Sequence, residues 1–186
     1  MEAFWKRLNR LHRERPSLYR QGRFDEVEDA ANRLIADATD AEQRNNARSI
    51  LVDLYHFRGD FDAALAAIEA QIEEKADDLQ AWLALTEHHH YAKIDLPKAA
   101  DAVEKTLSLA TQQVLLVRQV LGVRMRIALE TGAFDKASET LSSLIDYEPP
   151  AHSLDVAYEG DFLAKIPAGA VDAALIAKYT GLLSSK

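Results

Sequence analysis

Cysteine is absent from the chain of 186 residues. Disulfide bonds, thiolate zinc sites and a cysteine nucleophile are therefore excluded. Glycine and proline are scarce, with seven and five residues, so we expect no long linker or low-complexity tract. No run of about 18 apolar residues occurs, which argues against a membrane-spanning helix. The chain does contain 48% apolar residues, which is enough for a continuous core.

The formal net charge of −8 is unevenly distributed along the chain. Residues 1–23 carry seven Lys or Arg and two acidic residues, which makes this end +5 and leaves −13 for the rest. An acidic body argues against nucleic acid as the main partner. Charges also interrupt the N-terminal residues every few positions, so they lack the apolar segment of a signal peptide. We therefore expect a cytoplasmic protein.

Four stretches of the sequence repeat one local pattern. They are QGRFDEVE at 21–28, RGDFDAAL at 58–65, KIDLPKAA at 93–100 and TGAFDKAS at 131–138. Their Phe or Leu residues lie 37, 35 and 38 residues apart, and periods of about 20–50 residues are typical of stacked supersecondary units. Small or apolar residues follow three and seven positions later, which is the spacing of one helix face. Each stretch therefore predicts a helix.

Local signals place the start of each of these helices at the Phe or Leu. Asp or Pro comes directly after it, and both residues suit the first turn of a helix. Gly22, Gly59 and Gly132 come shortly before three of the four starts. At such a place the preceding helix must end in a residue that tolerates positive φ.

The segments that lead into the turns are predicted to be helical as well. Segments 41–58, 78–92 and 112–130 each carry apolar residues on one helical face. Asp40 and Gln43 have the spacing of a capping pair at the start of the first of these helices. Each repeating unit is therefore predicted to be a helix, a tight turn and a second helix.

At this point the chain resembles the tetratricopeptide repeat (TPR) family. The matching residues are the run YHFRGDFDAA at 55–64, Trp82 and Leu85 in the next unit, and Gly132, Phe134, Ala137, Glu148 and Pro149 in the last unit. The resemblance is good over 41–150 and poor over 8–40, because Pro16 is expected to interrupt the first helix. The third turn also departs from the family, since Lys93-Ile94-Asp95 replaces the glycine.

We therefore predict an all-α fold of stacked antiparallel helix pairs, a TPR-like α-solenoid. It would have about three to four repeats with N- and C-terminal capping helices. A single domain is expected over 1–186, with an N-terminal helix and a degenerate first repeat in 1–40, the repeat core in 41–150 and a capping segment in 151–186. Phe61 is expected to be a buried ring, the loss of which would cost about 3–5 kcal/mol. The last helix is expected to follow Pro167 and Gly169 and to bury a stripe of Val171, Leu175, Tyr179 and Leu182.

The resemblance also implies a binding surface. In the TPR family, the first helices of the pairs line a concave groove that receives peptides or partner segments. The corresponding positions and their neighbours here are Asn46, Ser49, Asp53, His56, Phe57, Gln80, Glu87, His90, Tyr91 and Arg126. We expect Asp53 and Glu87 to favour a segment with a basic residue. Protonation of His56 and His90 would weaken that binding as the pH falls through about 6.5.

Catalytic and metal chemistry have little support in the sequence. His88, His89 and His90 are consecutive, and consecutive helical residues point about 100° apart, so the three cannot converge on one ion. There is no Gly-rich phosphate loop, no H-E-x-x-H and no nucleophile elbow. We predict no metal, no cofactor and no enzymatic activity, and keep an enzyme or metal protein centred on these histidines as the third hypothesis.

The first hypothesis is thus a non-catalytic interaction module or scaffold that presents its groove to an unidentified protein or peptide. The alternative is a peripheral membrane or acidic-partner adaptor that acts through a basic amphipathic helix over 2–14. A capping role fits that helix as well. The groove positions supply no cationic clamp of the kind that chaperone-binding TPR proteins use, which argues against a chaperone-tail adaptor. A homo-oligomer is left open.

Overall fold

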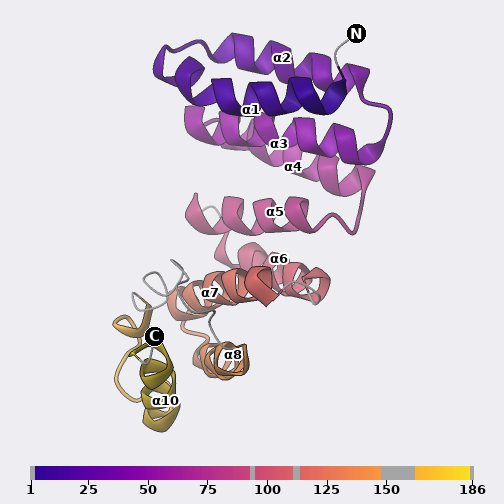
Figure 1. The fold of residues 1–186 in the computed structure, drawn as a ribbon. Coiled ribbons are helices and arrows are strands. Elements are labelled where there is room, and N and C mark those ends of the chain that lie inside the picture. The colour runs from indigo at the N-terminus through magenta and orange to yellow at the C-terminus, as the bar shows by residue number, and fades with distance from the viewer. Residues whose placement is uncertain (1–2, 93–94, 111–113, 148–161, 185–186) are drawn as a thin grey trace. The chain divides into compact units, whose positions relative to one another are not determined.

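The computed structural model describes residues 3–92, 95–110, 114–147 and 162–184. Within these ranges the chain forms nine helices and no strand, as Figure 1 shows. The helices are α1 (Phe4–Arg20), α2 (Phe24–Asp37), α3 (Ala41–Arg58), α4 (Phe61–Glu74), α5 (Leu79–Tyr91), α6 (Leu96–Leu109), α7 (Val114–Thr131), α8 (Phe134–Asp146) and α10 (Ala173–Ser184). The predicted all-α fold is confirmed for this part of the chain.

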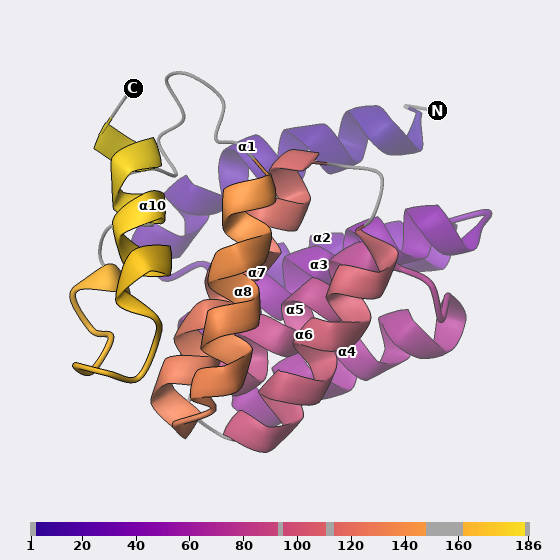
Figure 2. The same cartoon turned by 90° about the horizontal axis from the view of Figure 1, so that it is seen from below.

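The chain divides into two units, Met1–Ala92 and Lys93–Lys186. In the first unit, α1 packs on α2, α2 on α3, α3 on α4 and α4 on α5. In the second, α6 packs on α7, α7 on α8 and α8 on α10. Figures 1 and 2 show that successive helices such as α1 and α2, or α7 and α8, run antiparallel. Sequential packing of antiparallel helices is thus confirmed, and the single domain over 1–186 stays a prediction.

The turns between paired helices have the predicted chemistry. Gly59 ends α3 with a φ of 72°, and its N–H donates to the carbonyl of His56 while the next N–H, of Asp60, donates to that of Tyr55. Gly22 and Gly132 have nearly the same φ, 70° and 71°. Only a residue that tolerates the left-handed region ends a helix in this way. The helices after the repeated turns begin at the predicted residues, which are Phe24, Phe61, Leu96 and Phe134.

Aspartates cap five of the described helices; at the start of α10, the Asp172 carboxylate accepts the Ala174 N–H at 2.7 Å. The Asp40 carboxylate accepts the Gln43 N–H at 2.8 Å, and the Gln43 side chain in return accepts the Thr39 N–H at 3.1 Å. This confirms the predicted capping pair, which satisfies backbone donors that the helix itself leaves unpaired. The other capping aspartates are Asp60, Asp78 and Asp95.

The prediction that Pro16 interrupts the first helix is wrong. Helix α1 continues through Pro16 to Arg20. Proline removes only its own backbone hydrogen bond to the preceding turn, and the apolar residues on both sides of it pack on the same core. Leu8 and Leu11 before it are buried, and Leu18 after it is partly buried, against α2 and α3. Burial of this apolar face outweighs the lost bond.

A buried exchange of amide hydrogen bonds ties α3 to α4 and to the start of α5. The Asn45 side chain donates to the Gln71 carbonyl at 3.0 Å, and the Gln71 side chain donates to the Asn45 carbonyl at 2.8 Å. The Asn45 amide also donates to the carboxylate of Asp78, the capping residue of α5, at 2.8 Å. Asn45 and Gln71 are each only 3% exposed. Because buried polar groups are costly when unpaired, this exchange favours one relative position of the three helices.

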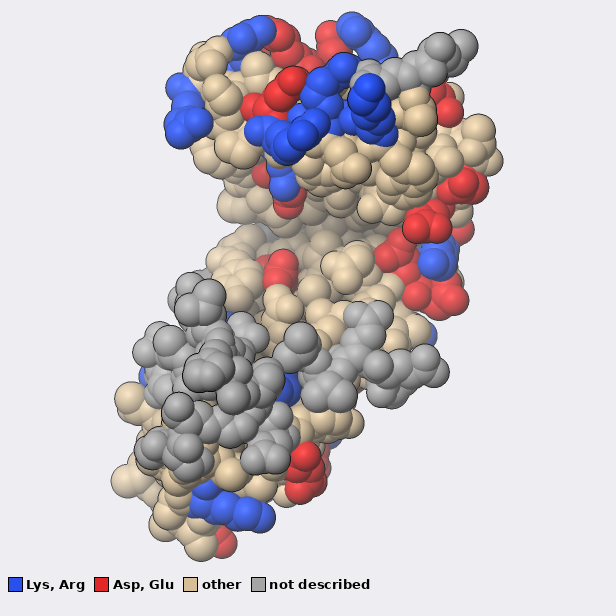
Figure 3. Space-filling view, in the orientation of Figure 1, with Lys and Arg blue, Asp and Glu red and all other residues tan. Residues whose placement is uncertain are grey.

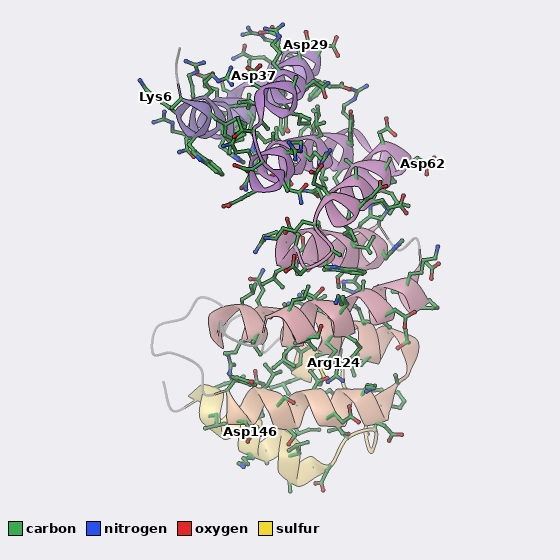
Figure 4. All side chains as sticks on the ribbon, turned by 90° about the vertical axis from the view of Figure 1, so that its right-hand side faces the viewer. Lys6, Asp29, Asp37, Asp62, Arg124 and Asp146 are labelled. Atoms are coloured by element: carbon green, nitrogen blue, oxygen red, sulfur yellow. The ribbon has the colours of Figure 1, made fainter. Side chains whose placement is uncertain are left out.

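Two buried arginines organise the second unit. The Arg118 guanidinium donates to the carbonyls of Leu144 and Tyr147 at the end of α8, and to the Tyr179 hydroxyl of α10 at 3.4 Å. These carbonyls have no acceptor role within the helix, and a cation there also complements the helix dipole. Arg124, labelled in Figure 4, bonds Glu104 of α6 at 2.7 Å and Thr140 of α8 at 3.1 Å.

The C-terminal segment packs in part as predicted, since Leu175 and Leu182 of the expected stripe are only partly buried and Val171 precedes α10. Tyr179 is fully buried, Val171 is nearly so, and Phe162 stacks on Tyr179 with ring centroids 6.1 Å apart. Helix α10 packs on α8, which agrees with a capping role for this part of the segment. Residues 151–161 of the predicted cap lie outside the described residues.

None of the helices in the described ranges combines the length with the apolar character that crossing a bilayer requires. This agrees with the sequence-based expectation that no helix spans a membrane.

We predict that Asn45→Ala lowers the free energy of unfolding by about 2–3 kcal/mol, because the Gln71 carbonyl and the Asp78 carboxylate each lose a buried donor. Asn46→Ala is the matched control. Asn46 is partly exposed and donates only to the Glu42 carbonyl of its own helix, so its loss should change stability by less than about 0.5 kcal/mol. Urea unfolding followed by circular dichroism measures both, and equal effects would contradict the structural role of Asn45.

Gly59→Val is expected to lower the free energy of unfolding by about 1–3 kcal/mol, because a β-branched residue is strained at a φ of 72°. No atom lies within 4 Å of a Cβ placed there, so the loss comes from backbone strain and not from a clash. Gly59→Asn, which tolerates the left-handed region, should lose less. Thermal unfolding that ranks the asparagine variant below the valine variant would refute this explanation.

Candidate partner-binding groove

Two pockets lie next to each other in the first unit, along the helices α3 and α5. The first, which we call the polar pocket, has a volume of about 330 Å³. The second, the acidic-aromatic pocket, has a volume of about 320 Å³. Ser49 and Asp53 are one turn apart on α3 and line different pockets, as do Gln80 and Ala84 on α5. The two pockets therefore follow each other along the same pair of helices.

Each pocket draws its lining from several helices. The polar pocket is lined by His12 of α1, Asn45, Asn46 and Ser49 of α3, Gln71 of α4, and Asp78 and Gln80 at the start of α5. The acidic-aromatic pocket is lined by Val52, Asp53 and His56 of α3, Phe61 of α4, and Ala84, Glu87, His88, Tyr91 and Ala92 in and after α5. The structure thus brings together seven of the ten predicted groove residues: Asn46, Ser49, Asp53, His56, Gln80, Glu87 and Tyr91.

Phe57, His90 and Arg126 do not line either pocket. Phe57 stacks on Tyr19 with ring centroids 4.9 Å apart, and it also contacts the tilted ring of Phe24 at 5.8 Å. His90 is buried on α5 and lines neither of these two pockets, so its place in the groove stays a prediction. Arg126 lies on α7 in the second unit.

His88 lies in the pocket where His90 was expected. Ala84, Glu87, His88 and Tyr91 have the spacing i, i+3, i+4 and i+7, which places them on one face of α5. His90 is two residues from His88 and so points away from that face. The 34-residue spacing to His56 led to His90, whereas the helical pattern that begins at Ala84 could have identified His88.

Arg15 does not line either pocket, but it contacts a groove residue, and the sequence did not indicate this contact. Its guanidinium forms an ion pair with the Asp53 carboxylate. Helix α1 continues through this region and brings Arg15 to α3. The acidic side chain of Asp53 is therefore already paired with a cation from the same chain.

The rings of His56, Phe61 and His88 form an aromatic cluster in the acidic-aromatic pocket. His56 Nε2 and His88 Nδ1 are hydrogen-bonded at 2.8 Å, and their ring centroids are 5.1 Å apart. Phe61 lies 6.2 Å from His56 and 6.3 Å from His88, measured between ring centroids. Phe61 is 40% exposed, so the prediction of a fully buried ring is wrong, and its truncation should cost less than the expected 3–5 kcal/mol.

The histidines of both pockets are held in their neutral form. Burial, assisted by the neighbouring His56 and His89, lowers the pKa of His88 to about 4, against the opposing effect of Asp62. Burial also lowers the pKa of His56, although Asp53 opposes it. The pKa of His12 is lowered by burial and by Arg15. The expected weakening of cation binding near pH 6.5 is therefore shifted to lower pH.

Glu87 lines the acidic-aromatic pocket without a cation beside it in the described part of the chain. Burial, with a further contribution from the charge of Asp53, raises its pKa. Among the residues that the structure describes, no Lys or Arg forms an ion pair with it. A partly buried carboxylate next to a second carboxylate favours either a proton or a positively charged ligand.

The basic N-terminal helix forms a distinct surface. Figure 3 shows Lys and Arg gathered over the face of α1 turned to the viewer, with acidic residues between them. Arg7 pairs with Asp37 of α2 at 2.7 Å, and Arg15 pairs with Asp53 of α3. Part of this positive charge therefore holds α1 to the neighbouring helices.

Within the described ranges, no group of three His, Asp or Glu has the arrangement of a metal site. His88 is hydrogen-bonded to His56, and the three consecutive histidines are buried residues of α5. The absence of a metal, of a cofactor and of catalysis remains a prediction.

Comparisons with known proteins give no identification. No family model matches the chain, and no curated protein matches it.

The titration of His88 should contribute to the change of the free energy of unfolding with pH. Its pKa in the folded protein, about 4, is below its ordinary value of 6.5, so the folded state binds fewer protons between these values. Its contribution to stability is present above pH 6.5 and is lost as the pH falls toward 4. His12 and His56 act in the same direction, and Glu87 acts in the opposite direction above its ordinary pKa.

The wild type should lose free energy of unfolding through His88 as the pH falls from 7.5 to 5. We predict that this loss is about 1–2 kcal/mol smaller in the variant His88→Phe. Comparing the variant with the wild type cancels the contributions of groups that do not contact His88, and His56, its hydrogen-bond partner, is replaced by Phe in both proteins of a second comparison. Urea unfolding at several pH values measures the difference, and parallel curves for the two proteins would show that His88 titrates normally.

Proposed function

We propose that the protein is a non-catalytic interaction module of TPR-like helix pairs and that it binds a segment of a partner protein or peptide in the groove. The observation that supports this proposal most is the pair of adjacent pockets along α3 and α5. They are separate depressions lined by polar, acidic and aromatic side chains, which suits an extended segment that places successive side chains in successive pockets. The repeat spacing of the four turns supports a TPR-like architecture.

The groove offers different chemistry at its two ends. In the polar pocket, Asn46, Ser49 and Gln80 present amide and hydroxyl groups that can bond the backbone of an extended segment. In the acidic-aromatic pocket, exposed rings lie beside carboxylates. Exposed aromatic rings are frequent anchors in protein interfaces because they bury a large area with few rotatable bonds. Such a combination supports binding of a peptide more than it supports catalysis.

The alternative of a membrane or acidic-partner adaptor through α1 receives less support. Arg7 and Arg15 are engaged in ion pairs within the chain, and Leu8 and Leu11, the apolar residues expected to meet a membrane, are buried in the core. Insertion of this face into a membrane would require α1 to leave the protein. A cytoplasmic location and the absence of enzymatic activity belong to the same proposal.

A photo-crosslinking experiment tests the groove. A photoreactive amino acid at position 80, which is exposed in the polar pocket, should form crosslinks to a partner in the native cell. The same amino acid at position 69, exposed on α4 and outside both pockets, is the control and should not. Equal crosslinking to the same partner at both positions would show that the groove is not the binding surface.

The double variant Asp53→Ala, Glu87→Ala provides a second test. We expect it to fold, because neither side chain is part of the apolar core and a surface ion pair contributes only about 0–1 kcal/mol. The crosslink yield at position 80 should fall at least about fivefold, the weakening that a lost charge pair of about 1 kcal/mol produces. The double variant Glu69→Ala, Glu73→Ala, with the same change of charge on exposed positions of α4, should retain it. Full crosslinking by both double variants would remove the acidic residues from the binding surface.

A further inference from the structure

The acidic-aromatic pocket has an unusual distribution of charge between its two sides. Asp53 on α3 is neutralised by Arg15. Glu87 on α5 lines the same pocket, and no described Lys or Arg pairs with it. One carboxylate of the pocket thus already holds a guanidinium, and the other has room beside it for a second one.

The rings around Glu87 suit a planar cation. Phe61 and Tyr91 line the pocket and are 40% and 58% exposed, although the Tyr91 ring also packs on His90 with ring centroids 4.9 Å apart. An arginine guanidinium stacks on aromatic rings and pairs with a carboxylate through two parallel hydrogen bonds. It is also less strongly hydrated than a lysine ammonium, which matters beside a partly buried carboxylate.

The histidine pair keeps the floor of the pocket uncharged. The hydrogen bond between His56 and His88 requires a nitrogen lone pair on one ring and an N–H on the other. His88 is 2% exposed, and its Nε2 has no hydrogen-bond partner in the described part of the chain. Protonation would bury a further unpartnered N–H and a charge, so the rings remain neutral and do not repel a cation.

We propose that this pocket binds the side chain of an arginine carried by the partner segment, with Glu87 as its counter-ion and Phe61 and Tyr91 as flanking rings. The inference rests on the proposed function and specifies the partner by its chemistry. The adjoining polar pocket, one turn away on both helices, would hold the neighbouring residues of the same segment. A partner segment must therefore carry an arginine at one defined position to bind in the groove.

Peptides selected from a random library displayed on phage, with the full chain as the target, provide the probe. Binding of the selected peptides, synthesised with a fluorescent label, is measured by fluorescence polarisation. We expect them to share an arginine at one position, and replacement of that arginine by citrulline, which has nearly the same shape without the charge, should weaken binding at least fivefold, or about 1 kcal/mol.

Variants of the protein test whether the arginine of the selected peptides binds in the acidic-aromatic pocket. Glu87→Gln should weaken the arginine peptides to the same extent and should leave the citrulline peptides unchanged. Glu73→Gln, the same substitution at an exposed position of α4 outside both pockets, should have no effect. Ala84→Arg places a guanidinium from the chain itself in the pocket, one turn before Glu87, and should block the arginine peptides. The circular dichroism spectrum and melting temperature of each variant establish that it is folded.

The outcomes separate the two proposals. If Ala84→Arg blocks the peptides but their binding depends neither on an arginine nor on Glu87, the arginine pocket is overturned and the peptide groove still stands. Peptides that Ala84→Arg does not weaken would overturn the pocket as a binding site, while crosslinking from position 80 decides the groove independently. If the wild type dimerises and Glu87→Gln is monomeric by light scattering, the occupant is a second copy of this chain, and the separate partner is overturned.

Discussion

The exchange of hydrogen bonds between Asn45 and Gln71, in which each buried side chain donates to the backbone carbonyl of the other residue, positions much of the first unit. It joins α3 to α4, and through Asp78 it reaches the first turn of α5. Apolar packing alone allows helices to slide or rotate with little loss, whereas a buried amide must meet its partner in one geometry. The rotation of α5 about its own axis determines that Glu87 and His88 line the acidic-aromatic pocket while His90 does not. The shape of the candidate site therefore depends on a polar contact outside the acidic-aromatic pocket.

Electrostatic pairing then determines what the groove can attract. Asp53 is paired with Arg15, and the pKa of His88 is lowered by burial, so neither contributes a free charge at neutral pH. Glu87 is the exception, since its neighbours raise its pKa and supply no cation. The binding preference of the pocket is thus set by the one group whose charge the fold leaves uncompensated, and a partner's cation would stabilise it most.

The second unit uses buried arginines where the first uses amides. Arg118 joins the end of α8 to the Tyr179 hydroxyl of α10, and Arg124 joins α6, α7 and α8. In both units, buried polar groups link successive helices and, through Asp78 and Tyr179, one helix further along the chain. Small and apolar residues fill the space between them. Removal of one partner from such a buried link leaves the others unsatisfied, so these residues matter more for stability than their number suggests.

Local signals in the sequence determined the helices and their boundaries. A left-handed glycine, an aspartate or proline in the first turn and a stripe of apolar residues act within a few residues of each other, so the starts at Phe24, Phe61, Leu96 and Phe134 could be predicted without tertiary information. The predicted groove residues followed from the resemblance to the TPR family. Only the tertiary structure showed that α1 continues through Pro16 and that Phe61 is partly exposed. It also showed that Arg15 pairs with Asp53 and that His88, bonded to His56, lies in the pocket where His90 was expected. Each of these features depends on how one helix is rotated and packed against another. The contacts involved join residues about 30 or more positions apart, and local spacing in the sequence does not encode them.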